Sequence, residues 1–292
     1  MRFLVTGVTG QLGYDVVKEL KDRGVSNEDI IECDRSIMDL TNKDDVKNVI
    51  SFFNPDVIIH CAAYTAVDKA EEDIANCYKV NVEGTRSIVE GAKNVNAKLI
   101  FVSTDYVFDG TKNISETYKV DDKTNPINIY GKTKRLAELE VKKYDKHFIV
   151  RTSWVFGING NNFVKTMLKL AETKDEIGVV SDQYGSPTYT VDLAKLLVDM
   201  AYTDKYGVYH ANNTGYMSWY EFAKNIFETN DIDIKVNPVL TKDYKTKAKR
   251  PMNSQLDRSE INKNGFDFLP PVSDAIKRYS EELKEKKLTL NN

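Results

Sequence analysis

Short apolar runs alternate with longer amphipathic segments along the first half of the chain. The runs are rich in Val, Ile, Leu and Phe and show no polar–apolar alternation, which predicts strands buried on both faces. The predicted strands are Arg2–Thr6, Asp29–Cys33, Asp56–His60, Lys98–Val102 and His147–Val150. The predicted helices between them are Gln11–Arg23, Lys43–Phe53, Glu72–Asn94 and Ile127–Lys143. This order indicates βαβ units, and hence an α/β fold with a parallel sheet and helices on both faces.

The pattern loosens in the second half, after about residue 151. Helical periodicity covers Asn162–Thr173, Val191–Tyr202 and Trp219–Glu228, and Gly207–Ala211 is strand-like. A loop-rich stretch then extends to about Pro271, and the closing EELKEKK run predicts a solvated terminal helix. We expect some segments of this half to return to the sheet.

Composition places the chain among ordinary globular proteins, since 41% of its 292 residues are hydrophobic and 29% are charged. A net charge of −3 argues against non-specific nucleic-acid binding, which needs a basic surface. No run approaches the roughly 18 apolar residues of a membrane span, and the apolar start is too short for a signal peptide. The odd number of cysteines (Cys33, Cys61 and Cys77) predicts reduced thiols and a cytoplasmic location. The histidines lack the close spacing of a metal site, so we expect no metal.

A glycine-rich turn directly follows the first predicted strand. Gly7, Gly10 and Gly13 form a GxxGxxG array in TGVTGQLG, which opens a predicted helix. Such glycines permit a tight turn and let backbone N–H groups approach a pyrophosphate at the helix N-terminus; a plain turn is the alternative. We therefore predict a Rossmann-type NAD(P)-binding domain over residues 1–150, and mainly a substrate-binding region over residues 151–292.

Two charged residues that favour different nicotinamide cofactors lie at the end of the second predicted strand. Asp34 can accept hydrogen bonds from the adenosine ribose hydroxyls, as in NADH. Arg35 could instead pair with the 2′-phosphate of NADPH. A little further, Asp39 and Leu40 could frame the adenine. We expect either NADH or NADPH to serve as cofactor, with a modest preference at most.

A hydroxyl, a phenol and an ammonium form the predicted catalytic group. Tyr130 and Lys134 stand at positions i and i+4 of a predicted helix, within the pattern YxxxK. The lysine is expected to lower the phenol pKa and to bond a cofactor ribose. Ser103-Thr104-Asp105 ends the LIFV strand, where open α/β sheets hold their ligands. A hydroxyl there can hold a substrate carbonyl while Tyr130 protonates the developing alkoxide.

These motifs resemble the extended short-chain dehydrogenase/reductase family and, within it, the dTDP-4-dehydrorhamnose reductase family. The resemblance covers nearly the whole chain, and its most specific segments are AAYTAVDKAE, DQYGSPT and RPMNSQLD. It implies NAD(P)H-dependent reduction of the C4 ketone of a dTDP-4-keto-6-deoxy sugar. In that reaction Tyr130 would be the proton donor, assisted by Lys134, with Thr104 orienting the ketone.

The same resemblance assigns binding residues by their position in the matching motifs. The glycine-rich turn includes Gln11 and Leu12, and the segment after the third predicted strand should line the cofactor with Ala62, Ala63, Tyr64 and Thr65. The sugar should be faced by Val67, Asp105, Tyr106 and Trp154, although Trp154 could equally be a core aromatic. The basic stretch 242–250 could meet the diphosphate, and Arg250 is favoured because it opens RPMNSQLD.

Two expectations and three alternatives remain open at this point. Some family members are dimers bridged by magnesium held by glutamates; here Asp15 is the only remnant of such a set, so a homodimer without metal is expected. Nucleotide-sugar 4-epimerases and 4,6-dehydratases share the fold, the cofactor and the tyrosine. Tyr106 stands where a dehydratase would carry a glutamate, which disfavours elimination. A non-catalytic relative is disfavoured because Thr104, Tyr130 and Lys134 are all kept.

Overall fold

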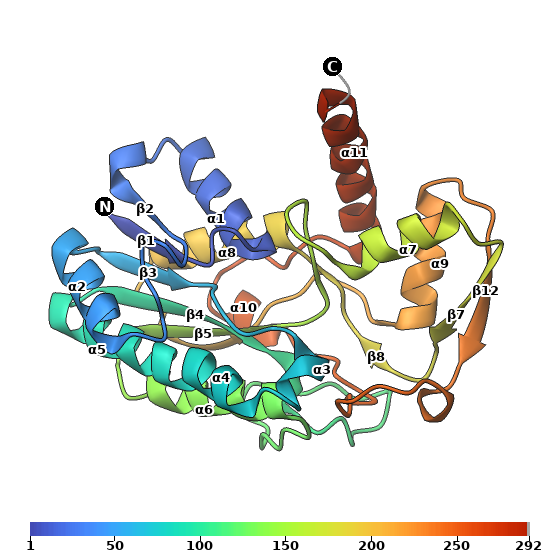
Figure 1. The fold of residues 1–292 in the computed structure, drawn as a ribbon, viewed down its shortest axis with the longest axis horizontal. Coiled ribbons are helices and arrows are strands. Elements are labelled where there is room, and N and C mark those ends of the chain that lie inside the picture. The colour runs from blue at the N-terminus through green and yellow to red at the C-terminus, as the bar shows by residue number, and fades with distance from the viewer. Residues whose placement is uncertain (291–292) are drawn as a thin grey trace.

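The computed structural model describes residues 1–290 and is built around a six-stranded sheet with helices on both faces (Figure 1). Its strands are β1 (Phe3–Thr6), β2 (Ile30–Cys33), β3 (Val57–His60), β4 (Lys98–Thr104), β5 (His147–Thr152) and β10 (Gly207–His210). They lie in the order β2-β1-β3-β4-β5-β10, and all neighbours are parallel. The order reverses between β1 and β3, which is where such sheets bind ligands. The predicted Rossmann-type α/β fold is therefore confirmed.

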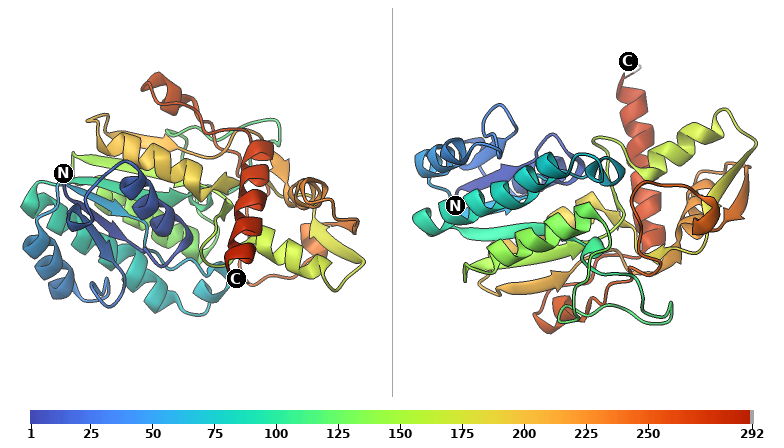
Figure 2. Two further views of the ribbon diagram at one scale, coloured as in Figure 1. Left: turned by 90° about the horizontal axis from the view of Figure 1, so that it is seen from above. Right: turned by 60° about the horizontal axis from the view of Figure 1, so that its bottom comes forward.

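Successive residues of each central strand enter two different cores, which explains the unbroken apolar runs. Phe3 and Val5 pack in the core beneath α1 (Gln11–Asp22) and α8 (Thr190–Ala201). Leu4, between them, faces the opposite core, beneath α2 (Lys43–Phe53), α5 (Thr85–Val95) and α6 (Ile129–Val141). Figure 2 shows α5 and α6 side by side across this second face. The second half of the chain thus supplies both a strand (β10) and a covering helix (α8) to the sheet.

The segment predicted as one helix over Glu72–Asn94 is not regular. After the short α3 (Val67–Ala70), the chain forms α4 (Ile74–Tyr78), a π-helical stretch η2 (Lys79–Gly84), and then α5. The prediction of a single α-helix is therefore wrong in the middle of this segment. Because π-helical turns occur mostly at functional sites, η2 marks this segment as a candidate part of such a site.

A smaller region packs around a third core at the other end of the molecule (Figure 1). Its main elements are α7 (Phe163–Ala171), β7 (Glu176–Val180), α9 (Trp219–Thr229), β12 (Lys235–Val239) and α11 (Val272–Leu290). Short pairings join β6 (Val155–Phe156) to β9 (Thr188–Tyr189), and β8 (Tyr184–Gly185) to β11 (Met217–Ser218). The remaining elements are three short 3₁₀ helices, η1 (Asn27–Asp29), η3 (Asp105–Val107) and η4 (Thr241–Asp243), and the short α-helix α10 (Ser259–Lys263). The stretch expected to be loops thus contains β12, η4 and α10.

The closing charged run belongs to α11, which begins well before it and projects from the body of the molecule (Figure 1). The buried side of this helix consists of Val272, Ala275, Ile276, Tyr279 and Ser280. Over residues 1–290, no helix combines the length and apolar character needed to cross a bilayer.

Candidate active site

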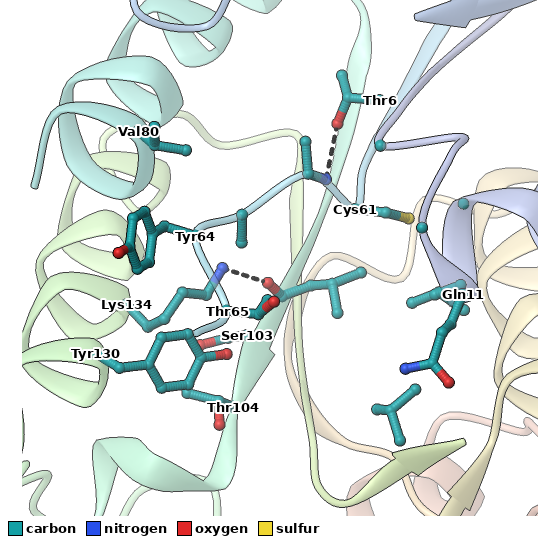
Figure 3. A pocket seen from close by; sticks show the side chains of 18 of the residues that line it. Thr6, Gln11, Cys61, Tyr64, Thr65, Val80, Ser103, Thr104, Tyr130 and Lys134 are labelled. Carbon is teal, nitrogen blue, oxygen red and sulfur yellow. Dashed lines mark hydrogen bonds between the residues drawn. The ribbon is translucent and has the colours of Figure 1, made fainter. Parts of the chain in front are cut away.

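A cavity of about 940 Å³ opens at the carboxyl ends of the sheet strands (Figure 3). It lies at the switch point between β1 and β3 and extends toward the smaller region, whose Trp154 and Trp219 form part of its wall. The structure brings nearly all of the predicted site residues to this cavity: Gly7, Gly10, Gln11, Leu12, Gly13, Asp34, Arg35, Asp39, Leu40, Ala62, Ala63, Tyr64, Thr65, Val67, Thr104, Asp105, Tyr106, Tyr130, Lys134 and Trp154. Within residues 1–290, Arg250 is the predicted residue that does not line it.

The glycine-rich turn has no room for a side chain at two of its glycines. Gly7 has φ +72°, and a Cβ added to it would lie 2.8 Å from Ala62 Cα. A Cβ on Gly13 would lie 2.3 Å from the Gly7 carbonyl oxygen, so both positions exclude a side chain. Helix α1 starts with Gly10 as N-cap and no side-chain hydrogen bond to its first N–H groups. Those N–H groups are therefore available to an anion.

Hydrogen bonds from Gly157, Asn159 and Asn162 tie this turn to the smaller region. The Gly157 amide and the Asn162 side chain both donate to Gln11 Oε1, each at 3.0 Å. The Asn159 side chain donates to the Thr9 carbonyl oxygen at 2.9 Å. The two halves of the molecule therefore meet directly at the phosphate end of the cavity.

The opposite, adenosine end holds the acids that follow β2. Asp34 Oδ1 already accepts hydrogen bonds within its own turn, from the Ser36 amide and hydroxyl and from the Ile37 amide. These bonds hold the pKa of Asp34 below its ordinary value, so the residue stays a carboxylate. Its Oδ2 is the oxygen left for a ribose. Arg35 also lines the cavity and is exposed. Its positive charge would favour a 2′-phosphate, whereas Asp34 would favour a free ribose hydroxyl.

A buried histidine supports the floor between β1 and β3. The ring of His60 hydrogen-bonds to the Thr6 hydroxyl at 2.7 Å and to the Thr85 hydroxyl at 3.2 Å. Thr6 in turn accepts the Ala62 amide at 3.0 Å, which fixes the backbone at the cofactor wall (Figure 3). Burial lowers the pKa of His60 to about 3, so the ring is neutral and acts as a structural bridge.

The predicted catalytic side chains converge from α6 and from the end of β4 (Figure 3). The Thr104 side chain lies close to the Tyr130 phenol, and the Thr104 hydroxyl donates to Asp105 Oδ1 at 2.9 Å. Lys134 is 3% exposed and donates to the Val102 carbonyl oxygen at 2.8 Å. The hydroxyl groups of Tyr130 and Thr104 are therefore held at one point of the cavity.

Glycine is required inside the YGK motif, because α6 approaches η3 closely. A Cβ on Gly131 would lie 2.1 Å from the Tyr106 carbonyl oxygen. The helix begins at Asn128, whose side chain accepts the Gly131 amide at 2.7 Å. This close approach sets the Tyr106 and Tyr130 rings edge to face, with centroids 5.9 Å apart.

The protonation states differ from the sequence expectation. Burial raises the pKa of Tyr130 above its ordinary value, and the nearby Thr104 side chain offsets this only in part. The sequence led us to expect a lowered phenol pKa, but in this structure burial outweighs any effect of Lys134, whose ammonium donates to the Val102 carbonyl oxygen. Burial also lowers the pKa of Lys134 to about 8, against an opposing contribution from Glu138. Tyr130 is thus a neutral phenol that retains its proton.

A buried ion pair fixes α6 against the sheet beneath these residues. Arg151 of β5 donates to the two Glu138 oxygens at 2.7 and 2.8 Å, in bidentate geometry. The Ser103 hydroxyl of β4 donates to Glu138 Oε1 at 2.7 Å. Glu138 is one turn beyond Lys134, and Ser103 precedes Thr104, so this network links the helix and strand that carry the catalytic group.

At the sugar end, Trp154 is both a cavity residue and part of the packing. Its ring stacks on Trp219 with centroids 3.6 Å apart, and its backbone has φ +48°, which is rare for a bulky residue. A Cβ on Gly185 would lie 2.6 Å from the Trp154 ring, so the glycine of DQYGSPT is needed for this placement. The two predicted roles of Trp154 are therefore compatible.

Arg250 is half-buried beside the cavity and pairs with an acid of the other half. Its guanidinium donates to Asp68 of α3 at 2.7 and 3.2 Å. It also hydrogen-bonds to the phenol of Tyr106, which does line the cavity. In the same basic stretch, Lys247 pairs with the exposed Glu72. Arg250 thus holds the C-terminal segment against α3, and its predicted contact with the substrate diphosphate remains a prediction.

Asp15, the residue considered for a metal, is buried on α1. Its carboxyl makes no regular hydrogen bond within residues 1–290, although the Thr190 side chain is close. Burial raises its pKa to about 6, and Glu282 adds to the effect. The described part of the chain contains no group of three or more His, Cys, Asp or Glu arranged to hold a metal ion. The expected absence of a metal stays a prediction.

Several lining residues were not anticipated from the sequence. They are supplied by strand ends, by the π-helical turn and by the smaller region: Thr6, Cys61, Val80, Val102, Thr152, Ser153, Val155, Asn161 and Trp219. Thr6 is the first residue of the TGVTGQLG motif and Cys61 directly precedes AAYTAVDKAE, so both belong to or adjoin motifs that the sequence already shows. Val80 and Trp219 carry no comparable signal, because tertiary packing alone brings them to the cavity.

Fold and cavity together define a Rossmann-type protein of the extended short-chain dehydrogenase/reductase class. More narrowly, the chain belongs to the RmlD substrate binding domain family, whose model matches residues 1–285. It is 45% identical, over 89% of its length and 92% of the relative's, to a dTDP-4-dehydrorhamnose reductase of Aggregatibacter actinomycetemcomitans. It is 39% identical to the spore coat polysaccharide biosynthesis protein SpsK of Bacillus subtilis, over 91% of this chain and 92% of that one.

Solved structures agree with this assignment. A dTDP-4-dehydrorhamnose reductase from Bacillus anthracis, crystallised in complex with NADP, superimposes with a TM-score of 0.92 at 41% identity, covering 96% of this chain and 99% of that one. A UDP-glucose 4-epimerase from Thermus thermophilus superimposes with a TM-score of 0.80 over 97% of this chain and 99% of that one, but is only 18% identical. That likeness shows a shared fold alone.

Proposed function

We propose that this chain is an NADPH- or NADH-dependent reductase that converts dTDP-4-dehydrorhamnose to dTDP-L-rhamnose. The observation that carries the proposal is the closeness of the Tyr130 phenol and the Thr104 hydroxyl in the cavity wall. This pair presents a neutral acid and a hydroxyl at one point, in a cavity whose far end is a glycine-rich turn with no room for a side chain at Gly7 or Gly13. The sequence similarity to reductases of that name supports the choice of substrate.

The chain's own residues divide the work along the cavity. A bound nicotinamide cofactor would supply the hydride. The N–H groups at the start of α1 would hold its pyrophosphate, and Asp34, Arg35 and Asp39 would meet the adenosine end. Lys134 lies within the same cavity, where its ammonium can bond a ribose hydroxyl. The cofactor would then be oriented along the carboxyl ends of the strands.

Tyr130 is the proton donor in this proposal. As hydride reaches C4, negative charge develops on the ketone oxygen, and the phenol hydrogen of Tyr130 moves to that oxygen. Its raised pKa keeps the phenol protonated before the reaction. Lys134, one helical turn away, stabilises the phenolate as it forms, because an opposite charge favours the ionised state. The sugar is expected to contact Val67, Asp105, Tyr106 and Trp154.

An assay with dTDP-4-dehydrorhamnose tests the proposal. The purified protein should oxidise NADPH or NADH in step with formation of dTDP-L-rhamnose, identified by NMR. dTDP-glucose, which lacks the ketone, is the control substrate and should leave the cofactor reduced. Absence of cofactor oxidation with the keto sugar, by protein shown to bind the cofactor, would refute the proposal and favour a non-catalytic relative.

The same assay separates the two other enzymatic alternatives. A 4-epimerase would interconvert nucleotide hexoses with no net consumption of reduced cofactor. A 4,6-dehydratase would release water from dTDP-glucose and regenerate its cofactor. A homodimer and a cytoplasmic location are further expectations, testable by light scattering and by cell fractionation.

A further inference from the structure

The single hydrogen of the Thr104 hydroxyl has more than one possible destination. Thr104 Oγ1 accepts the Tyr106 amide at 3.2 Å and lies 2.9 Å from Asp105 Oδ1, as its donor. A hydroxyl has one hydrogen to donate. While Asp105 is a carboxylate, it accepts that hydrogen, and Thr104 has none to offer a substrate ketone. The charge of Asp105 therefore decides what Thr104 can do in the reaction.

The surroundings of Asp105 favour the neutral acid. Asp105 is 2% exposed, and within residues 1–290 its Oδ2 makes no regular hydrogen bond, although the Ser254 side chain approaches the carboxyl. A buried carboxylate with an unpaired oxygen costs much more than the corresponding acid. Burial raises the pKa of Asp105 to about 6, against the partial effect of Ser254 and Thr104. Protonated and ionised forms are thus both accessible near neutral pH.

The other titratable groups around this carboxyl hold constant charges below about pH 7. Tyr106 on η3 and Tyr130 on α6 both face Asp105, and burial raises the pKa of each, so both stay neutral. Arg250 of the C-terminal segment reaches Tyr106 and has a raised pKa, so it stays charged. Lys134, farther along α6, has its pKa lowered to about 8 and loses its proton only above this range. A pH change within the range therefore acts on Asp105.

We propose that Asp105, in its carboxylic acid form, is the donor that turns the Thr104 hydroxyl toward the substrate ketone. The acid hydrogen of Asp105 then bonds to Thr104 Oγ1, and the Thr104 hydrogen is released toward the ketone oxygen. Two hydrogen bonds, from Tyr130 and Thr104, meet the oxygen where charge develops. Asp105 acts through Thr104 and is a positioning residue. The inference rests on the proposed reductase function and deepens it.

The pH dependence of hydride transfer tests this role. In single-turnover experiments from about pH 5 to about pH 7, the wild-type rate should fall above about pH 6, by up to about tenfold per pH unit. Asp105→Asn places a permanent N–H donor beside Thr104, so the slope should vanish and the rate at about pH 7 should exceed that of the wild type. Asp105→Leu removes the donor and should be at least about tenfold slower than Asp105→Asn throughout.

The outcomes that contradict the inference are distinct. If Asp105 only contacts the sugar, Asp105→Asn will raise KM and keep the wild-type pH slope. A flat wild-type profile would also overturn the proposal. Infrared titration of the protein provides a readout that does not depend on turnover. A protonated-carboxyl band that titrates near pH 6 and disappears in Asp105→Asn is expected, and titration near the ordinary aspartate value of about 4 would overturn the inference even if the keto sugar were not a substrate.

Discussion

Replacing Arg151 with methionine would remove one partner of the buried ion pair that supports the catalytic helix. Glu138 is fully buried and Arg151 is 1% exposed. In Arg151→Met the Glu138 carboxylate would keep the Ser103 hydroxyl and the partly exposed Arg135, at 3.0 Å, as partners. Removing one member of a buried pair typically costs about 3–5 kcal/mol. We expect the free energy of unfolding at neutral pH to fall by that amount, a large share of the roughly 5–15 kcal/mol of a typical domain.

The same loss should depend on pH in a defined direction. Burial alone would raise the pKa of Glu138, but Arg151 and Ser103 hold this pKa below its ordinary value in the folded protein. The ion pair therefore stabilises the fold above the unfolded-state pKa of about 4.5, and this contribution is lost as the pH falls through the lower folded value. Without Arg151, burial should dominate and Glu138 should take up a proton more readily. The destabilisation by Arg151→Met is thus expected to shrink as the solution is acidified toward about pH 5.

Urea unfolding followed by circular dichroism, at neutral pH and near pH 5, measures both effects. The double variant Glu138→Gln/Arg151→Met, which leaves no buried charge in the pair, should recover part of the lost stability. Lys235→Met is the matched control, because its ion pair with Glu176 is mostly exposed, and it should cause no measurable loss. A loss below about 1 kcal/mol for Arg151→Met, or one of the same size at both pH values, would refute the reasoning.

Three further predictions concern the cavity itself. Tyr130→Phe should lower kcat by about 10²- to 10⁴-fold and leave the Kd of the cofactor unchanged, whereas Lys134→Met should impair both; near-normal turnover of Tyr130→Phe would contradict its role as proton donor. Arg250→Ala should raise KM for the sugar nucleotide without changing cofactor affinity, and an unchanged KM would leave Arg250 with the structural contacts described above. NADH and NADPH should differ by no more than about tenfold in kcat/KM, with Asp34→Ala shifting the preference toward NADPH and Arg35→Ala toward NADH; a hundredfold wild-type preference would show that only one of the two residues meets the ribose.

The strands of the central sheet could be predicted closely from the sequence because burial on both faces leaves a direct signature. The run Asp56–His60 was expected as a strand, and β3 spans Val57–His60. By contrast, β7 and β12 pair only with each other; three of the five residues of β7 are buried, and none of β12 is. Pro238 within β12 also weakens the strand signal. Their pairing joins segments far apart in the chain, so the local sequence offered little to detect.

The residues that line the cavity were easier to predict from the sequence than the contacts that hold them in place. Local motifs carried the glycine-rich turn and the pairing of Tyr130 with Lys134, because both depend on short-range spacing. The contact between Arg250 and Asp68 spans 182 residues, and no local pattern indicates it. The π-helical turn of η2 was missed for a related reason. Asn81 of this turn accepts the Tyr64 amide at 2.8 Å, so a tertiary contact accompanies the departure from regular α-helix.

The protonation state of Tyr130 shows most clearly why the sequence pattern was insufficient. The spacing of Tyr130 and Lys134 suggests an ammonium that favours phenolate, but it does not report burial. In the structure, burial dominates and the phenol stays protonated, while the ammonium bonds to the Val102 carbonyl. A neutral phenol suits a reduction, because the acid must hold its proton until hydride arrives. In the proposed mechanism Lys134 would then stabilise the phenolate that proton transfer produces, because an adjacent positive charge lowers the free energy of that product state.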